Sequence, residues 1–315
     1  MAKDEDGRGG TWKALKQRWS GRTAERAAAS EDAARLRSRR ASAPERTRVF
    51  TTSNQKGGVG KTTTTVNLAA AMARTGMRVL VIDMDPQGNA STALNVPHGA
   101  EVASVYDVLL DEMELHEVVQ DAPDVDGLQV VPSTTELAGA EIELVSLVAR
   151  EQRLSRALER YMAWREEQGQ ERLDYVFIDC PPSLGLLTVN AFVAAEEVLI
   201  PIQAEYYALE GLSQLLNNVQ MIQKHLNPRL QVTTILLTMF DARMNLAVQV
   251  AEEVRSHFPD QLLDIAIPRN VRISEAPSYQ QTVLTYDPAS AGAVPYREAA
   301  AEIARRGAPV VRSAR

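Results

Sequence analysis

The feature that most restricts the fold of this chain is a glycine-rich loop between a predicted strand, residues 48–53, and a predicted helix, residues 61–75. Glycines let the backbone curl so that its N–H groups face phosphate oxygens, and the start of the helix adds the positive end of its dipole. A lysine there supplies charge to the phosphates, and the next hydroxyl is a ligand for Mg²⁺. The loop predicts a nucleotide phosphate site with Thr63 placed to reach the α-phosphate, and its residues are Gly57, Gly58, Val59, Gly60, Lys61, Thr62 and Thr63.

After this loop, apolar segments of strand length alternate with segments of helical periodicity. The predicted strands cover 48–53, 78–82, 127–131, 174–178, 198–201 and 231–238. The predicted helices cover 61–75, most of 136–164, a stretch from about 183, 208–225, 245–258 and 290–305. Alternation of this kind predicts an α/β fold, a doubly wound and mostly parallel sheet flanked by helices. In such sheets, ligands bind at the carboxyl ends of the strands.

Composition excludes several other classes of protein. The chain has 315 residues, of which 45% are hydrophobic and 24% are charged. No apolar run approaches the roughly 18 residues of a membrane span. The single cysteine, Cys180, excludes an intrachain disulfide and fits the reducing cytoplasm, which is the expected location. It also argues against an iron–sulfur carrier, which needs more than one cysteine ligand.

Charge divides the chain into three parts. Residues 1–48 hold 13 Lys and Arg against 7 Asp and Glu, although the net charge of the whole chain is −7. We expect a disordered basic extension over 1–47, a folded P-loop domain over 48–306 and a short basic tail over 307–315. Within the extension, the spacing of Trp12, Leu15 and Trp19 favours a short basic helix. That segment is either a transient helix or a docking helix for a protein or an anionic membrane.

Acidic residues follow two of the predicted strands. Asp83 and Asp85 come after the apolar run 79–82, and Asp179 ends the apolar run 175–178 in a Walker B pattern. A carboxylate at this sheet edge can orient water or bind Mg²⁺ through water, and Asp179 is expected to hold the Mg²⁺ shell. Phosphoryl transfer to water needs positioning and charge neutralisation, and no strong general base is evident. We therefore expect a slow ATPase of the kind that suits a timed switch.

The loop also departs from the usual P-loop pattern, because Gln55 replaces the first glycine and Lys56 follows it. The run from Lys56 to Thr62 resembles the deviant Walker A motif of the ParA/MinD superfamily. By that resemblance, Lys56 reaches the partner's ATP across a nucleotide-sandwiched homodimer. The same resemblance implies that Asp85 positions the attacking water and that Asp83 lies near the metal. The spacing alone indicates only a second cation near the phosphates.

A stretch near the end of the chain is similar to the ParA/Soj chromosome-partitioning proteins. It runs from Ile267 to Arg272 and continues through Ser274–Tyr279, after which Gln280-Gln281 replaces the family's usual Gly-Lys pair. The resemblance implies that Pro268 and Asn270 lie beside adenine. It also implies nonspecific binding of double-stranded DNA on the nucleoid by ATP dimers, and a ParB-type centromere-binding partner. Our candidates for the DNA contacts are Arg243, Arg269 and Arg272.

The alternative function is that of a membrane-surface positioning ATPase like MinD. Those proteins carry an amphipathic helix at the C-terminus, whereas residues 307–315 offer only Val310-Val311 as an apolar pair. A membrane role is therefore not expected from this end, and the basic segment 12–19 is the feature that keeps it open.

Overall fold

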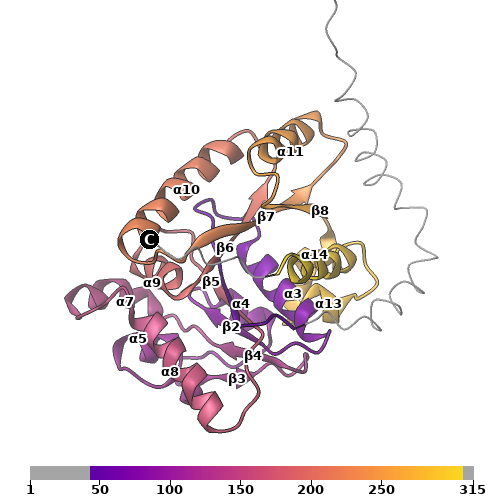
Figure 1. Cartoon of the computed structure of the whole chain (residues 1–315). Coiled ribbons are helices and arrows are strands. Elements are labelled where there is room, and N and C mark those ends of the chain that lie inside the picture. The colour runs from indigo at the N-terminus through magenta and orange to yellow at the C-terminus, as the bar shows by residue number, and fades with distance from the viewer. Residues whose placement is uncertain (1–42, 308–315) are drawn as a thin grey trace, which may run out of the picture.

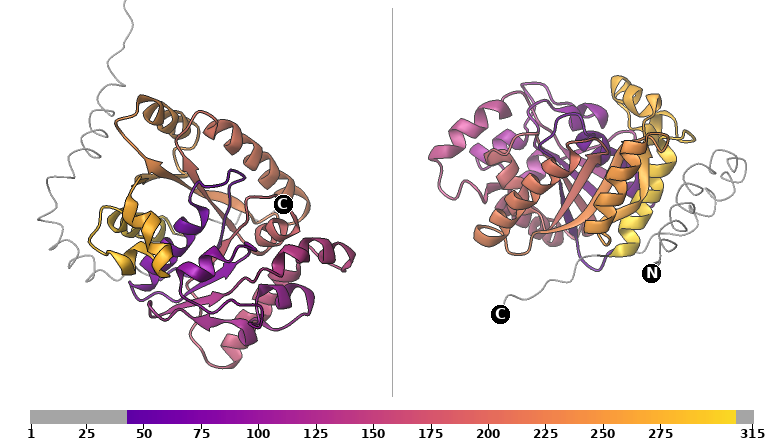
Figure 2. Two further views of the ribbon diagram at one scale, coloured as in Figure 1. Left: turned by 180° about the vertical axis from the view of Figure 1, so that it is seen from behind. Right: turned by 90° about the horizontal axis from the view of Figure 1, so that it is seen from above.

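The computed structural model describes residues 43–307, and the predictions made for residues 1–42 and 308–315 lie outside this range. The described chain forms one central sheet with helices on both faces (Figures 1 and 2). No helix within residues 43–307 is long and apolar enough to cross a membrane.

Eight strands form the sheet, in the order β3-β4-β2-β5-β1-β6-β7-β8. All neighbouring strands are parallel except β3 and β4, which pair antiparallel. The predicted fold class is thereby confirmed. The strands are β1 (Arg48–Thr52), β2 (Val79–Asp83), β3 (Gln120–Asp121), β4 (Leu128–Val131), β5 (Tyr175–Asp179), β6 (Glu197–Gln203), β7 (Gln231–Phe240) and β8 (Leu262–Pro268).

Each face of the sheet is covered by its own group of helices. One face packs against α3 (Lys61–Ala73), α4 (Asn89–Ala93), α13 (Val283–Tyr286) and α14 (Ala293–Arg306). The other packs against α5 (Val105–Leu110), α6 (Leu115–Val118), α7 (Leu137–Glu143), α8 (Arg153–Glu167), α9 (Leu186–Ala194), α10 (Ala208–His225) and α11 (Asn245–His257). Two short helices, α12 (Val271–Glu275) and η3 (Ala276–Tyr279), follow β8.

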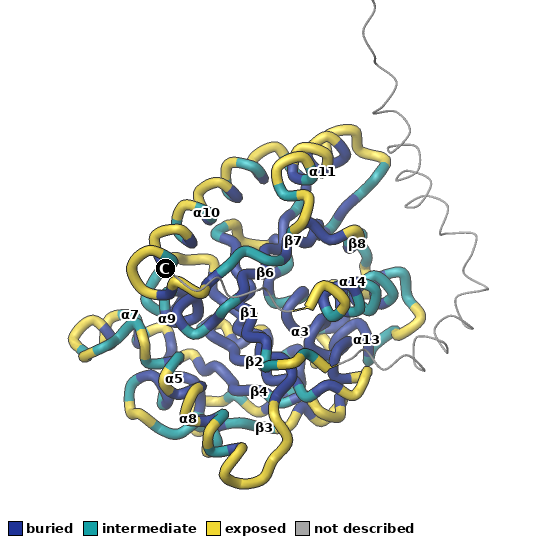
Figure 3. The backbone as a smooth tube through the Cα atoms, viewed as in Figure 1, coloured by how far each residue is buried: buried dark blue, intermediate teal, exposed yellow. Residues whose placement is uncertain are grey.

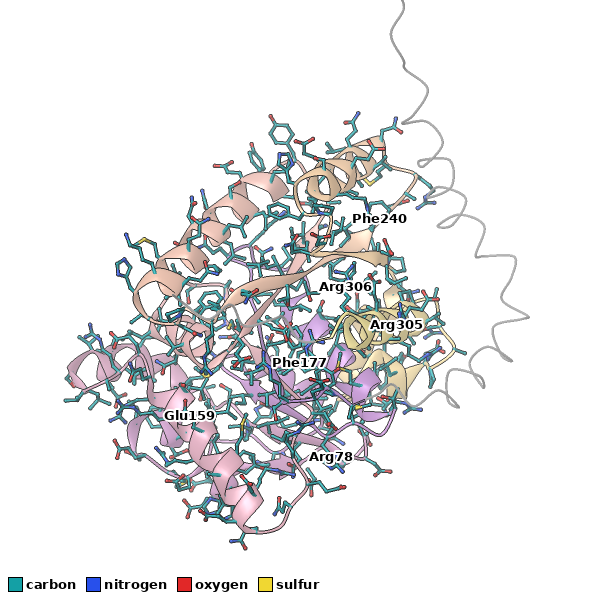
Figure 4. All side chains as sticks on the ribbon, viewed as in Figure 1. Arg78, Glu159, Phe177, Phe240, Arg305 and Arg306 are labelled. Carbon is teal, nitrogen blue, oxygen red and sulfur yellow. The ribbon has the colours of Figure 1, made fainter. Side chains whose placement is uncertain are left out.

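The core explains why the central strands read as continuous apolar runs. Every residue of β1, β2 and β5 is buried, because helices cover both faces (Figure 3). Phe50 and Phe177 stack at 5.3 Å between ring centroids on one face, with Phe177 near the centre of the molecule (Figure 4). The buried Arg48 donates to Glu197 at 2.7 Å across the start of the sheet. The strand register pairs Asp179 of β5 with Thr52 of β1 and with Asp83 of β2, so the carboxyl ends of these three strands lie side by side.

The structure corrects several predicted boundaries. The predicted helix over 136–164 is broken into α7, the 3₁₀ turn η2 (Leu144–Ser146) and α8, with Ala149 at φ 52° in the break. Strands β3 and β8 and the short helices α4, α5, α6, α12 and α13 were not predicted. These elements have only two to seven residues, which is too short for a repeating pattern of apolar residues to be recognised in the sequence. Tertiary pairing and packing stabilise them instead.

Candidate functional site

The glycine-rich loop joins β1 to α3 and is anchored to the neighbouring strands. Gly58 (φ 73°) and Gly60 (φ 85°) adopt left-handed conformations, which explains the need for glycine at both positions. Thr238 of β7 donates from Oγ1 to the Val59 carbonyl at 2.8 Å. Asn54 donates to the Pro201 carbonyl of β6 at 2.8 Å and accepts from the Lys56 N–H at 3.0 Å. These bonds hold the loop in its curled form.

The backbone N–H groups of this loop are available to a ligand. Within residues 43–307, no acceptor bonds to the N–H groups from Gly57 to Thr62. A row of free N–H groups at the start of a helix is a site for an anion. The loop therefore fits the phosphates of a nucleotide by its own geometry.

Asp179, at the end of β5, is bonded to the first turns of α3. It is fully buried and accepts from the Thr62 hydroxyl at 2.6 Å and from the Thr65 hydroxyl at 3.0 Å. Burial raises the pKa of Asp179, and the neighbouring Asp83 carboxylate raises it further. Thr65 was not predicted as part of the site, although its position three residues after Thr62 places both hydroxyls on one side of the helix. Asp179 and Thr62 together form an oxygen donor set of the type that Mg²⁺ prefers.

The two carboxylates at the end of β2 occupy different environments. Asp83 is fully buried and accepts from the Ser91 N–H at 2.9 Å, the Ser91 hydroxyl at 2.7 Å and the Asp85 N–H at 3.2 Å. Burial raises the pKa of Asp83 despite these bonds. Asp85 is 9% exposed and accepts from the Gln87 N–H at 3.0 Å. Asp83 thus shapes the loop through Ser91, which was not predicted, and Asp85 is the carboxylate closer to solvent.

The two lysines of the loop also differ. Lys61 is 7% exposed, and its Nζ lies 3.3 Å from the Lys56 carbonyl, to which it donates. Burial lowers the pKa of Lys61, although the nearby Asp179 carboxylate opposes that shift. Lys56 is an exposed side chain that forms an ion pair with Glu205, in the loop between β6 and α10. Sequence reasoning did not find Glu205, because 149 residues separate it from Lys56.

A cavity of about 220 Å³ opens beside the start of α3. Side chains of α3, α4 and the α12–η3 segment line it, among them Thr62, Thr63, Asn89 and Pro277. It also includes Gln281, one of the two residues that depart from the family pattern. The predicted adenine residues do not line this cavity. Pro268 ends β8, and Asn270 caps α12 by accepting from the Arg272 N–H at 2.8 Å.

The three predicted DNA-binding arginines follow β7 and β8. Arg243 donates to both oxygens of Asp241 at 2.7 to 3.2 Å, and its side chain is 90% exposed. The bonds from Arg243, with a contribution from the charge of Arg269, lower the pKa of Asp241 to about 2. Arg272 pairs with Glu275 at 3.1 Å and with Asp287 at 3.5 Å. The structure therefore pairs Arg243 with Asp241, and it places Arg272 in ion pairs of its own.

A parallel sheet with a glycine-rich loop after β1 and a buried Asp at the end of β5 defines a P-loop nucleoside triphosphatase. The family model described as an AAA domain matches residues 47–232. The sporulation initiation inhibitor protein Soj of Bacillus subtilis is 52% identical over 82% of this chain and 99% of its own length. The chromosome partitioning protein ParA of Myxococcus xanthus is 48% identical over 83% of this chain and 89% of its own length. The chain belongs to the Soj/ParA family of chromosome-partitioning ATPases.

A solved structure supports the fold independently. Cobyrinic acid a,c-diamide synthase from Mycobacterium smegmatis, with bound ADP and magnesium, superposes with a TM-score of 0.69 at 34% identity. The similarity covers 82% of this chain and 94% of that one.

Proposed function

We propose that this chain is a Mg²⁺-dependent ATPase that converts ATP and water to ADP and phosphate and acts as a switch on DNA. In this proposal ATP drives homodimerisation, the dimer binds double-stranded DNA without sequence preference, and a ParB-type centromere-binding partner stimulates hydrolysis and release. The observation that carries the proposal is the Asp179–Thr62 hydrogen bond of 2.6 Å beside the buried Lys61, because it assembles donors for a metal and for phosphate at one point.

Binding of ATP is assigned to the loop and to α3. The free N–H groups from Gly57 to Thr62 and the ammonium of Lys61 would contact the β- and γ-phosphates, and Thr63 would contact the α-phosphate. Thr62 and Asp179 would hold Mg²⁺, with Asp83 in the surrounding shell. When bound, Mg²⁺ neutralises charge on the phosphoryl oxygens. The bound ADP and magnesium of the Mycobacterium smegmatis protein support this assignment.

Adenine recognition is assigned to Pro268 and Asn270, at the carboxyl end of β8. Their position at the same sheet edge as the phosphate loop supports this role. In this arrangement, the Asn270 side chain exchanges or shares its bond to the Arg272 N–H when the base is bound.

Hydrolysis is assigned to Asp85, which would orient the attacking water. Its neighbour Asp83 is already saturated by three donors, so Asp85 is the carboxylate at the end of β2 that remains partly accessible. The residues nearby supply positioning and positive charge rather than a strong base, and turnover is therefore slow.

Dimerisation is assigned to Lys56. Its exposed ion pair with Glu205 is worth no more than about 1 kcal/mol, so the partner's phosphates can replace Glu205 at small cost. With Lys56 engaged across the interface, each site is completed by the other subunit.

DNA binding is assigned to Arg243, Arg269 and Arg272. All three lie after the carboxyl ends of β7 and β8 and are exposed, which suits contacts to backbone phosphates. A twofold dimer would double this set of cations and offset the acidic body of the protein.

Retention on nonspecific duplex DNA tests the proposal. The chain is applied with ATP or with ADP at several salt concentrations, and turnover is measured with and without a ParB-type partner. We expect salt-sensitive retention with ATP only, and faster turnover when the partner is added. Equal retention with both nucleotides would contradict the switch.

A further inference from the structure

An apolar patch on the surface is formed by the segment that contains α7. Ile142, Val145 and Val148 are 79%, 57% and 88% exposed, and Leu184, in the loop before α9, is 44% exposed. The α7 helix projects from the rim of the molecule, and its outer side is exposed (Figures 1 and 3). We call these four residues the α7 patch. Exposed apolar side chains gathered in this way mark an interaction surface.

Three of the four patch residues lie in a stretch of sequence that is acidic. From Val79 to Ala149 the chain contains 14 Asp and Glu and no Lys or Arg. Glu136 and Glu143 are exposed, and no lysine or arginine pairs with either in the described structure. The nearest cation along the chain, Arg150, donates to the Val145 carbonyl at 2.7 Å, and its charge is offset by an ion pair with Glu151 at 2.9 Å. An apolar patch with an acidic border fits a basic amphipathic segment.

The chain itself contains such a segment outside the described residues. Trp12, Leu15 and Trp19 fall on one side of a helix by their spacing, and Lys13, Lys16 and Arg18 are interspersed with them. Residues 1–42 hold 11 Lys and Arg against 6 Asp and Glu, whereas residues 43–307 hold 21 against 35. The charges of the two parts are therefore complementary.

A second exposed apolar group fits this segment less well. Tyr206 and Tyr207 are 74% and 67% exposed, and Met244 is 55% exposed. They adjoin Lys56, through its pair with Glu205, and Arg243. At that edge Lys56 and Arg243 offset the charges of Glu205 and Asp241, whereas Glu136 and Glu143 beside the α7 patch have no lysine or arginine partner among the described residues.

The connecting chain is long enough for the segment to reach the patch. The described chain begins beside Arg172, which donates to the Pro44 carbonyl just before β5. The α7 helix follows the carboxyl end of β4, whereas Arg172 precedes the amino end of β5. The start of the described chain and the α7 patch therefore lie at opposite ends of the strands. A strand of five residues such as β5 spans about 17 Å. The 23 residues from 20 to 42 reach about 76 Å when extended and about 26 Å as a random coil.

We infer that residues 12–19 dock on the α7 patch of their own chain, with the two tryptophans and Leu15 on the apolar side chains and the basic residues toward the acidic border. Inside the patch, the Glu141 carboxylate packs directly against Gly185, where it leaves no room for a side chain. Gly185 is the N-cap of α9 and ends the loop that follows Asp179. The docked segment therefore lies next to the loop that carries the metal-binding carboxylate.

Disulfide trapping in the full-length chain tests this docking. Lys16→Cys is combined with Ser146→Cys beside the patch or, as a matched control, with Ser256→Cys on α11, where the serine is also exposed. The native Cys180 does not interfere, because it is fully buried and burial raises its pKa to about 12. We expect the 16–146 disulfide to form about tenfold faster than the 16–256 disulfide, independently of protein concentration.

A surface substitution provides the second measurement. Val148→Lys should slow the 16–146 disulfide to the control rate, whereas Met221→Lys on α10, where Met221 is 59% exposed, should leave it unchanged. Equal rates for the two cysteine pairs would overturn the inference. A disulfide rate that falls with dilution would also overturn it, because the segment would then dock on a second copy of the chain. Binding of the segment to added anionic vesicles, with no 16–146 disulfide formed, would overturn it as well.

Discussion

The phosphate site and the edge at the ends of β7 and β8 differ in how their charged groups are held. Asp179, Asp83 and Lys61 are buried and bonded by neighbours from several elements. At the edge, the exposed Arg243 and Arg272 pair with the partly exposed carboxylates of Asp241 and Glu275. Buried charges need their partners, because leaving one unpaired is costly, whereas exposed pairs are exchanged with little loss. The buried part of the phosphate site is thus formed by residues of one chain, and the edge is suited to contacts with another molecule.

The largest effect should come from removing the buried lysine. Lys61→Ala takes away the buried side-chain cation of the phosphate loop, so nucleotide affinity should fall at least about 100-fold. Titration with a fluorescent ATP analogue measures the nucleotide affinity. Lys56→Ala is the matched control, in which the monomer should still bind the nucleotide. Unchanged affinity in Lys61→Ala would mean that the loop does not hold the phosphates.

Removing the accessible carboxylate should separate binding from hydrolysis. Asp85→Ala should lower ATP turnover about 100-fold while ATP still binds, because the change leaves the bonds of Asp83 and Asp179 in place. Release of phosphate and retention on DNA measure the two effects, and the variant should stay on DNA. Normal turnover would show that Asp85 does not position the water.

Reversing a charge at the exposed edge should affect DNA alone. Arg243→Glu should reduce retention on duplex DNA at least about tenfold, since it would replace the proposed phosphate contact by repulsion in each subunit of the proposed dimer. ATP-dependent dimerisation, measured by light scattering, should remain. Arg229→Glu, an exposed arginine paired with Glu196 at the opposite edge, is the control and should bind DNA normally. Loss of dimerisation in Arg243→Glu would indicate an interface role instead.

The smallest effect should come from the exposed ion pair of Lys56. Glu205→Gln should change the free energy of unfolding by less than about 1 kcal/mol, because both side chains are nearly half exposed. Urea denaturation measures it, with Glu210→Gln on α10 as the control. A loss of more than about 2 kcal/mol would show that this pair is structural and is not free to exchange.

The sequence by itself determined the fold class and the phosphate loop. The glycine-rich loop between a strand and a helix, followed by Lys and Thr, predicted a phosphate site. The strands β1, β2 and β5 are apolar throughout because helices cover both faces of the sheet. Asp85 and Asp179 were found at the ends of such runs, since the carboxyl ends of parallel strands share one edge.

Tertiary structure alone decided the remaining partners of the site. Three bonds at the site join residues that no sequence pattern links. They are Thr65 to Asp179, Ser91 to Asp83 and Lys56 to Glu205. The antiparallel strand β3 and the break between α7 and α8 were likewise decided by pairing and packing across the fold. Local sequence specifies conformation over a few residues, and contacts between distant segments depend on where the whole sheet places them.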